Sequence, residues 1–288
     1  PINLDAGLTA INVPDLVIGQ HQVAGTAMNY GATSIHALEI SWQLNDGLVH
    51  TTNFTGLNLE TSMEYDFVSD QPINVDPGNY LLKVWVSRVN GQAGDDNPDN
   101  DMLQKNISVL DEPIQRVPMF EEFTSSTCPP CATFNSTVMN PFFNQYQQDI
   151  SLVKYQMNWP GIGDPYYTAE GGVRRSYYGV NAVPSMFIEG ANVATNWTAV
   201  FNAYQNAMSQ DAFMEISAQH IIEGDDITVN AIIKPYVNAT NVRVHIVVVE
   251  QTTYGNVGSN GESSFKHVMM KMLPNANGTA ANLTVGSH

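Results

Sequence analysis

The sequence predicts three domains: a β-sandwich over residues 1–111, an α/β domain over 112–212 and a β-rich domain over 213–288. Short alternating runs separated by turn residues predict the first domain. In the middle part, apolar strands alternate with helical patterns, which is typical of α/β folds. Strand-like runs return after residue 213. The final residues are also strand-like, so we expect the third domain to be truncated.

Alternating side chains mark the strands of the first domain. Leu38, Ile40, Trp42 and Leu44 alternate with polar or small residues, and the hairpin turn 45–47 follows them. Further strands are expected over 21–30, 80–87 and 102–110.

The order of features in this domain resembles a known family. One strand ends in Asn29-Tyr30-Gly31, another begins at Pro77-Gly78, and an Asp/Asn-rich turn precedes the last strand. This order resembles the bacterial CARDB type of immunoglobulin-like domain. The resemblance implies an Ig-like β-sandwich for residues 1–111 alone.

The Asp/Asn-rich turn spans residues 95–101, with the sequence Asp-Asp-Asn-Pro-Asp-Asn-Asp. Its oxygen-bearing side chains suit Ca²⁺, but an EF-hand would need Gly at the sixth position and Glu at the twelfth. Asp, Asn and Pro are also common turn formers, so a solvated hairpin tip is the alternative.

The α/β domain is expected to contain strands over 117–123, 150–157 and 184–189. Helices are expected to begin at Cys128, at Asp164 and after a cap at Asn196. Asn140-Pro141 reads as an N-cap followed by proline, so the first helix should be kinked or split there.

Net charge excludes some classes of partner. The 288 residues contain 28 acidic and 11 basic residues, which gives a net charge of −17. Nucleic acids and anionic membranes require clusters of Lys and Arg, so we expect neither as a partner.

No apolar run is long enough to span a membrane. No signal peptide opens the chain, so it is either cytosolic or already trimmed, and the missing initiator Met favours trimming.

The two cysteines stand in the sequence Cys128-Pro129-Pro130-Cys131, between an apolar strand and a helix. A cysteine at a helix start meets free N–H groups and the helix dipole, which lower its pKa. We therefore expect Cys128 to be the nucleophile and Cys131 the resolving thiol of an exchange reaction.

These residues resemble the thioredoxin superfamily, so the middle domain is expected to be thioredoxin-like. The resemblance implies that Glu122 is a buried acid that assists deprotonation of Cys131. It also implies that Pro184 is a cis-proline beside the disulfide, and the preceding Val183 looks like that of periplasmic thiol oxidases. Two features depart from the pattern: Thr127 replaces the usual Trp, and the fourth strand after residue 190 is expected to be short or absent.

Other interpretations of the chemistry stay open. A CxxC pair can be half of a zinc site, although no second ligand pair follows. The pair could also be an idle disulfide in a binding protein. The methionines in the segment 265–274 suit Cu(I) or ordinary strand packing. Arg174 and Arg175 could receive an acidic partner or form a solvated helix face. No cofactor is expected.

The combined motifs resemble one wider family. They are the segment around Cys128, the Tyr-Tyr-Gly-Val-Asn-Ala-Val-Pro segment that ends at Pro184, and the Met-rich strand. Residues 113–288 thereby resemble the outer-membrane-protein-28-related family of Bacteroidetes. The resemblance implies an exported protein, either secreted or on the outer-membrane surface, often with a C-terminal secretion domain that we expect this chain to lack.

Two functions from different classes follow. The first is thiol–disulfide exchange outside the cytoplasm, with protein thiols and disulfides as partners. The second is a surface adhesion, binding or assembly protein, in which the thioredoxin-like domain is a scaffold with a structural disulfide. The sequence does not indicate an oligomeric state.

Overall fold

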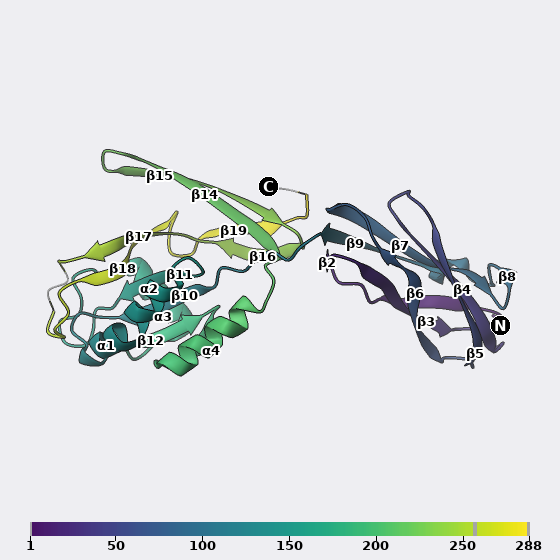
Figure 1. Cartoon of the computed structure of the whole chain (residues 1–288), viewed down its shortest axis with the longest axis horizontal. Helices are drawn as coiled ribbons and strands as arrows, with labels where there is room; N and C mark the ends of the chain where they lie inside the picture. Colours follow the sequence, from purple (N-terminus) through teal and green to yellow (C-terminus); the bar gives the residue numbers. More distant parts are fainter. Residues whose placement is uncertain (1, 256–257, 287–288) are drawn as a thin grey trace. The chain divides into compact units, whose positions relative to one another are not determined.

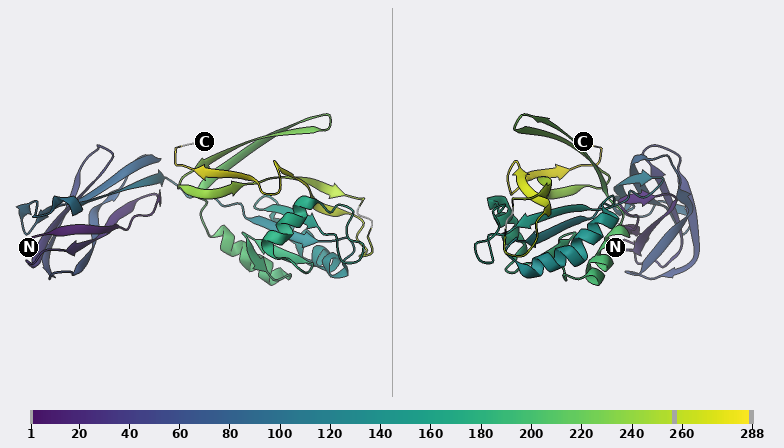
Figure 2. Two further views of the ribbon diagram at one scale, coloured as in Figure 1. Left: turned by 180° about the vertical axis from the view of Figure 1, so that it is seen from behind. Right: turned by 60° about the vertical axis from the view of Figure 1, so that its left-hand side comes forward.

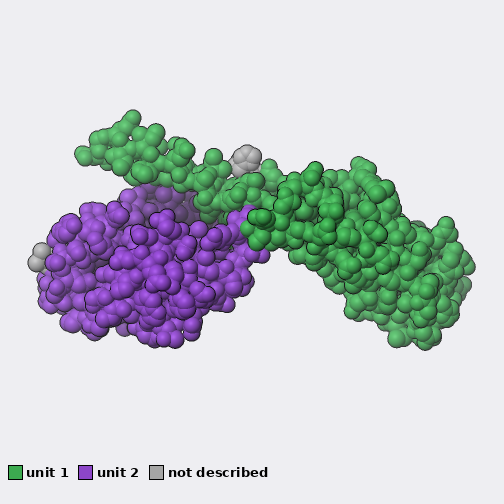
Figure 3. Space-filling model, in the orientation of Figure 1, with its two compact units in different colours: residues 1–113, 213–239, 283–288 green, residues 114–212, 240–282 purple. Residues whose placement is uncertain are grey.

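The computed structural model describes residues 2–255 and 258–286. The chain divides into two compact units. Unit 1 contains residues 1–113, 213–239 and 283–288, and unit 2 contains residues 114–212 and 240–282 (Figure 3). The residues expected to form a third domain are thus shared between the two units, and the three-domain division stays a prediction.

The first 113 residues of unit 1 form two sheets (Figure 1), and one hydrophobic core lies between them. The smaller sheet has the order β1 Ala6–Ile11, β3 His21–Asn29 and β6 Glu64–Ile73. The larger sheet has the order β2 Leu16–Ile18, β9 Met102–Leu110, β7 Gly78–Val89, β4 Ile35–Leu44 and β5 His50–Leu59, with β8 Gln92–Ala93 paired to β7. Two sheets packed around a shared core form a β-sandwich, as the sequence predicted.

The predicted alternation explains how this core forms. The apolar residues Leu38, Ile40, Trp42 and Leu44 of β4 are all buried. Side chains of a strand point alternately to its two faces, so one face of β4 supplies these four residues to the core. The turn after β4 contains Asn45 with φ of 52°, a conformation that asparagine tolerates.

The acidic turn packs against the start of the chain. Asp95 Oδ2 accepts a hydrogen bond of 2.7 Å from the Ala6 N–H, and Asp96 Oδ2 accepts one of 3.1 Å from the Leu4 N–H. A short 3₁₀ helix, η1 Pro98–Asn100, closes the turn. The turn is therefore solvated only in part: Asp96 and Asp99 are exposed, while the carboxylates of Asp95 and Asp96 accept from backbone N–H groups at and just before β1.

Asp101, at the end of this turn, makes unit 1 sensitive to pH. Burial, followed by the nearby carboxylates of Asp95 and Asp5, raises the pKa of Asp101 to about 6. Because this pKa is higher in the folded chain than in the unfolded chain, the protonated carboxyl stabilises the fold. The stabilisation is complete below the unfolded pKa and is lost as the pH rises through about 6. We expect Asp101→Asn to stabilise unit 1 by about 1 kcal/mol at pH 7.5, after allowance for solvent screening, and by much less at pH 4.5.

Hydrogen exchange of β1 and β9 at the two pH values measures this effect. Asp99→Asn is the matched control, because Asp99 is an exposed acid in the same turn. An equal gain at both pH values, or an equal gain in the control, would contradict the assignment.

Unit 2 is built on a six-stranded mixed sheet. Its order is β13 Ala191–Val193, β12 Ser185–Ile188, β10 Met119–Thr124, β11 Ser151–Gln156, β18 Phe265–Leu273 and β17 Ile246–Thr253. Strands β10 and β11 are parallel, and β12 is antiparallel to β10. The three-residue strand β13 shows that the expected fourth strand is short rather than absent.

Helices cover the sheet of unit 2 (Figure 2). They are α1 Pro129–Phe134, the π-helical segment η2 Asn135–Met139, α2 Asn140–Tyr146, α3 Ala169–Tyr178 and α4 Trp197–Met208. One core contains residues of α1, η2, α2 and α4, together with Phe120 of β10. A second core contains Phe123 of β10 and Tyr178 of α3. Because successive side chains of β10 alternate between the two cores, the sheet is covered on both faces.

Two helix starts differ from the predictions. Asn140 is not a cap, since η2 runs directly into α2; the split lies there because Pro141 lacks an N–H group. Helix α3 begins after Thr168, whose Oγ1 accepts a hydrogen bond of 3.0 Å from Gly171, and not at Asp164. The cap at Asn196 is confirmed, because Asn196 Oδ1 accepts from the Ala199 N–H at 3.0 Å.

The last part of the chain forms two further strand pairs. Strands β14 Met214–Glu223 and β15 Asp226–Pro235 form an antiparallel hairpin in unit 1. Strands β16 Ala239–Val244 and β19 Thr279–Leu283 form a two-stranded sheet. Among the described residues, no helix has the length and apolar character needed to span a bilayer.

Candidate functional site

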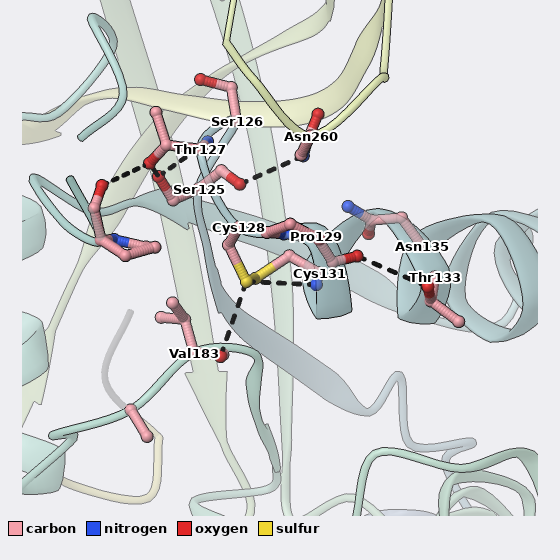
Figure 4. The surroundings of a disulfide bond; sticks show 12 residues. Ser125, Ser126, Thr127, Cys128, Pro129, Cys131, Thr133, Asn135, Val183 and Asn260 are labelled. Atoms are coloured by element: carbon pink, nitrogen blue, oxygen red, sulfur yellow. Dashed lines mark hydrogen bonds between the residues drawn. A yellow bond between two sulfur atoms is a disulfide. The ribbon is translucent and has the colours of Figure 1, made fainter. Parts of the chain in front are cut away.

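Cys128 and Cys131 form a disulfide at the start of α1, with their Cα atoms 5.2 Å apart. Cys128 is the N-cap of the helix, and its Sγ accepts a hydrogen bond of 3.1 Å from the Cys131 N–H (Figure 4). The two prolines occupy the first turn, where their missing N–H groups leave no bond unmade. In a reduced site the same N–H would donate to a Cys128 thiolate and lower the pKa of that thiol.

The segment that precedes β12 lies against the disulfide. Cys128 Sγ is 3.6 Å from the carbonyl oxygen of Val183, a residue 55 positions further along the chain (Figure 4). The Val183–Pro184 peptide bond is cis. The structure therefore brings together the two segments that the sequence singled out.

The site is largely shielded from solvent. Cys128 is 2% exposed and Cys131 is fully buried. Thr127 stands where the related pattern has Trp, and its Oγ1 donates a hydrogen bond of 2.6 Å to the Pro160 carbonyl. Asp164 Oδ2 accepts another, of 2.9 Å, from the Ser126 N–H. These two bonds hold the residues before Cys128 to the loop after β11.

Glu122 of β10, the acid that the sequence singled out, is buried and pairs with a lysine. It is fully buried on β10, and its Oε2 lies 3.0 Å from Nζ of Lys154, which is 2% exposed. The parallel register of β10 and β11 places the two residues directly opposite each other. The expected burial of Glu122 is thus observed, and β10 and β11 are both interior strands of the sheet.

The sequence reasoning missed Lys154, although a signal was present. Lys154 interrupts an apolar run that was predicted to be a strand. A charged residue at such a position has to be paired when it is buried, and Glu122 is the carboxylate on the neighbouring strand.

A polar network extends from this ion pair towards the loop before β18. Lys154 Nζ donates a short hydrogen bond to Asn135 Oδ1, and Asn135 Nδ2 donates one of 3.1 Å to Glu262 Oε1. Asn260 in turn donates to the Ser125 carbonyl at 3.2 Å (Figure 4). No local sequence signal could have predicted these contacts, since Asn135 and Glu262 are 127 positions apart.

A second ion pair lies on the opposite face of the sheet. Arg174 Nη2 is 2.7 Å from Glu121 Oε1, which also accepts a hydrogen bond of 2.8 Å from the Tyr155 hydroxyl. Burial, followed by the hydrogen bond to Glu121 and the charge of Glu121, raises the pKa of Tyr178. The prediction that Arg174 belongs to a solvated helix face is wrong, because this ion pair holds α3 on β10.

Metal sites receive no support from the geometry. Among residues 2–255 and 258–286, no group of three or more His, Cys, Asp or Glu is arranged to hold a metal ion. The Met-rich strand has a packing role, since Met269 and Met272 are 1% exposed and lie in the second core of unit 2.

Comparisons with known proteins give little further information. No protein-family model matches the chain, and no curated protein matches it. Among solved structures, a domain of a candidate cell-surface protein from Methanosarcina acetivorans is 20% identical, with a TM-score of 0.32, over 38% of this chain and 94% of that one. A CARDB domain from Pyrococcus furiosus, solved in complex with di-metal ions, is 17% identical, with a TM-score of 0.29, over 38% and 89%. Such values assign neither a fold nor a function.

Proposed function

We propose that residues 112–212, together with β17 and β18, form a thioredoxin-like domain. We further propose that its Cys128–Cys131 pair exchanges with protein thiols and disulfides outside the cytoplasm. The observation that carries the proposal is the position of the disulfide. The disulfide lies at the start of α1, in the connection between the parallel strands β10 and β11. Cys128 also contacts Val183, just before the antiparallel strand β12. The order β11-β10-β12-β13 also supports a thioredoxin-like topology.

The proposed exchange proceeds in two steps through a mixed disulfide. In the reduced site the Cys128 thiolate attacks a substrate disulfide, forms a mixed disulfide and releases one substrate thiolate. Cys131 then loses its proton to a base and attacks Sγ of Cys128. This step re-forms the Cys128–Cys131 bond and releases the second substrate thiolate, and solvent protonates both released thiolates.

The buried ion pair supports the second step. Neither carboxylate oxygen of Glu122 accepts a hydrogen bond from the described residues, although Lys154 lies beside Oε2. Its free lone pairs suit the role that the thioredoxin resemblance implies for Glu122, which is to accept the Cys131 proton. Pro184 would orient an incoming chain beside Cys128.

An exported location belongs to the same proposal. Disulfides persist in oxidising compartments, and this chain has no cysteine outside the pair. The resemblance to the outer-membrane-protein-28-related family adds a surface or outer-membrane association, or secretion.

Burial of both sulfurs favours a second candidate function. Cys128 and Cys131 are nearly inaccessible in the oxidised state, as expected of a structural disulfide in a binding or assembly protein. The experiment that separates the two functions is a redox titration of the folded chain with glutathione. Reduction within the range of known exchange proteins supports the first function, and a pair that glutathione does not reduce supports the second.

A further inference from the structure

The loop before β18 contacts the segment just ahead of the cysteines. The Asn260 N–H donates a hydrogen bond of 3.0 Å to the Ser126 carbonyl, and Asn260 Nδ2 donates one of 3.2 Å to the Ser125 carbonyl. The Ser125 carbonyl also accepts a hydrogen bond of 3.1 Å from the Cys128 N–H. Gly258 approaches so closely that a Cβ there would lie 2.0 Å from the Ser126 carbonyl oxygen. The loop thus packs directly against Ser125 and Ser126, and Ser125 accepts the hydrogen bond from the Cys128 N–H.

Glu262 occupies a defined position in this loop. Its Oε2 accepts a hydrogen bond of 2.7 Å from Asn260 Nδ2, and its Oε1 accepts one of 3.1 Å from Asn135 Nδ2. Its own N–H donates to Asn260 Oδ1 at 2.9 Å. Both carboxylate oxygens are therefore held by side-chain amides, so the carboxyl points into the network and not into solvent.

The same network contains the buried ion pair of Glu122 and Lys154. Asn135 bridges Glu262 and Lys154, and Lys154 pairs with Glu122. Lys154 therefore pairs directly with Glu122 of β10 and is connected through Asn135 to Glu262 of the loop. His267 of β18 also titrates near Lys154: burial, followed by the charges of Lys154 and Lys266, lowers the pKa of His267.

We propose that Glu262 is a positioning residue of the dithiol site: it shares the charge of Lys154 with Glu122 and so sets the pH range over which the reduced cysteines ionise. This role rests on the proposed exchange function. Burial raises the pKa of Glu262, while the hydrogen bond from Asn260 and the charge of Lys154 oppose the shift.

The sign of the effect follows from the charges. A carboxylate near the site repels a developing thiolate, whereas Lys154 attracts it. Glu262→Gln removes one of the two carboxylates in the network of Lys154, and thiolates at Cys128 and Cys131 become more favourable. We expect the pH midpoint of alkylation of the reduced chain to fall. We also expect the equilibrium with glutathione to shift about threefold to tenfold towards the dithiol form.

Two matched variants separate this role from a structural one. Glu262→Asp keeps the charge and should restore the wild-type pH midpoint. Glu250→Gln removes an exposed carboxylate from the neighbouring strand β17 and should leave both quantities unchanged. An unchanged midpoint and equilibrium in folded Glu262→Gln would overturn the proposal, as would an equal shift in the Glu250 control.

A measurement on the wild-type chain covers the case in which Glu262→Gln does not fold. The ¹³C resonance of the Glu262 carboxyl can be titrated in the oxidised and reduced states. The proposal expects the titration midpoint to differ between the two states, and identical midpoints would overturn it. If glutathione does not reduce the wild-type pair at all, the proposed exchange function itself fails, and that result is distinct from identical midpoints in a reducible pair.

Discussion

Replacing Cys128 by serine is expected to abolish thiol–disulfide exchange completely. Serine has no thiolate to attack a substrate disulfide, and Cys131 is fully buried, so it cannot take over the first step. The rate is measured with the reduced chain and a disulfide-containing peptide.

Cys131→Ala is the matched variant for this experiment. It retains Cys128 and should form a stable mixed disulfide with the peptide, visible as a single added mass. Exchange by Cys128→Ser at the wild-type rate would refute the assignment of the nucleophile, and so would the absence of any adduct on Cys131→Ala.

Replacing Lys154 by methionine should destabilise unit 2 by about 3–5 kcal/mol. The substitution leaves Glu122 charged and unpaired in a fully buried position, and an uncompensated buried charge is costly. Denaturant unfolding followed by the fluorescence of Trp159 and Trp197, both in unit 2, measures the loss.

Two controls accompany this prediction. Lys83→Met removes the exposed ion pair with Asp46 in unit 1 and should cost at most about 1 kcal/mol, measured there by Trp42 and Trp85. The double variant Glu122→Gln, Lys154→Met removes both charges and should recover most of the stability. If Lys154→Met lost no more stability than Lys83→Met, the buried charge of Glu122 would not depend on Lys154 for its stabilisation, and the prediction would be wrong.

Local sequence patterns predicted the strands of the β-sandwich and the start of helix α1 at Cys128. The alternation in β4 reports directly which side chains are buried, and it needs no knowledge of partners. Cys128 was placed at a helix start because Pro129 and Pro130 are tolerated only in a first turn. Glu122 was found by its offset from Cys128 in a related pattern.

Interactions between distant segments were not predictable in the same way. Arg174 looked solvent-exposed because its partner, Glu121, is on another element. Asn260 and Glu262 carry no motif, and their role depends on how the hairpin of β17 and β18 joins the sheet. The division of residues 213–288 between two units has the same cause, since strand patterns do not specify which core a strand joins.

The reduction potential of the Cys128–Cys131 pair tests the central claim most directly. It is measured by alkylation of free thiols and intact mass after equilibration in graded glutathione buffers. The exchange function predicts a potential between roughly −270 and −120 mV, where working exchange proteins lie. A pair that stays oxidised below about −300 mV would contradict that function and identify a structural disulfide.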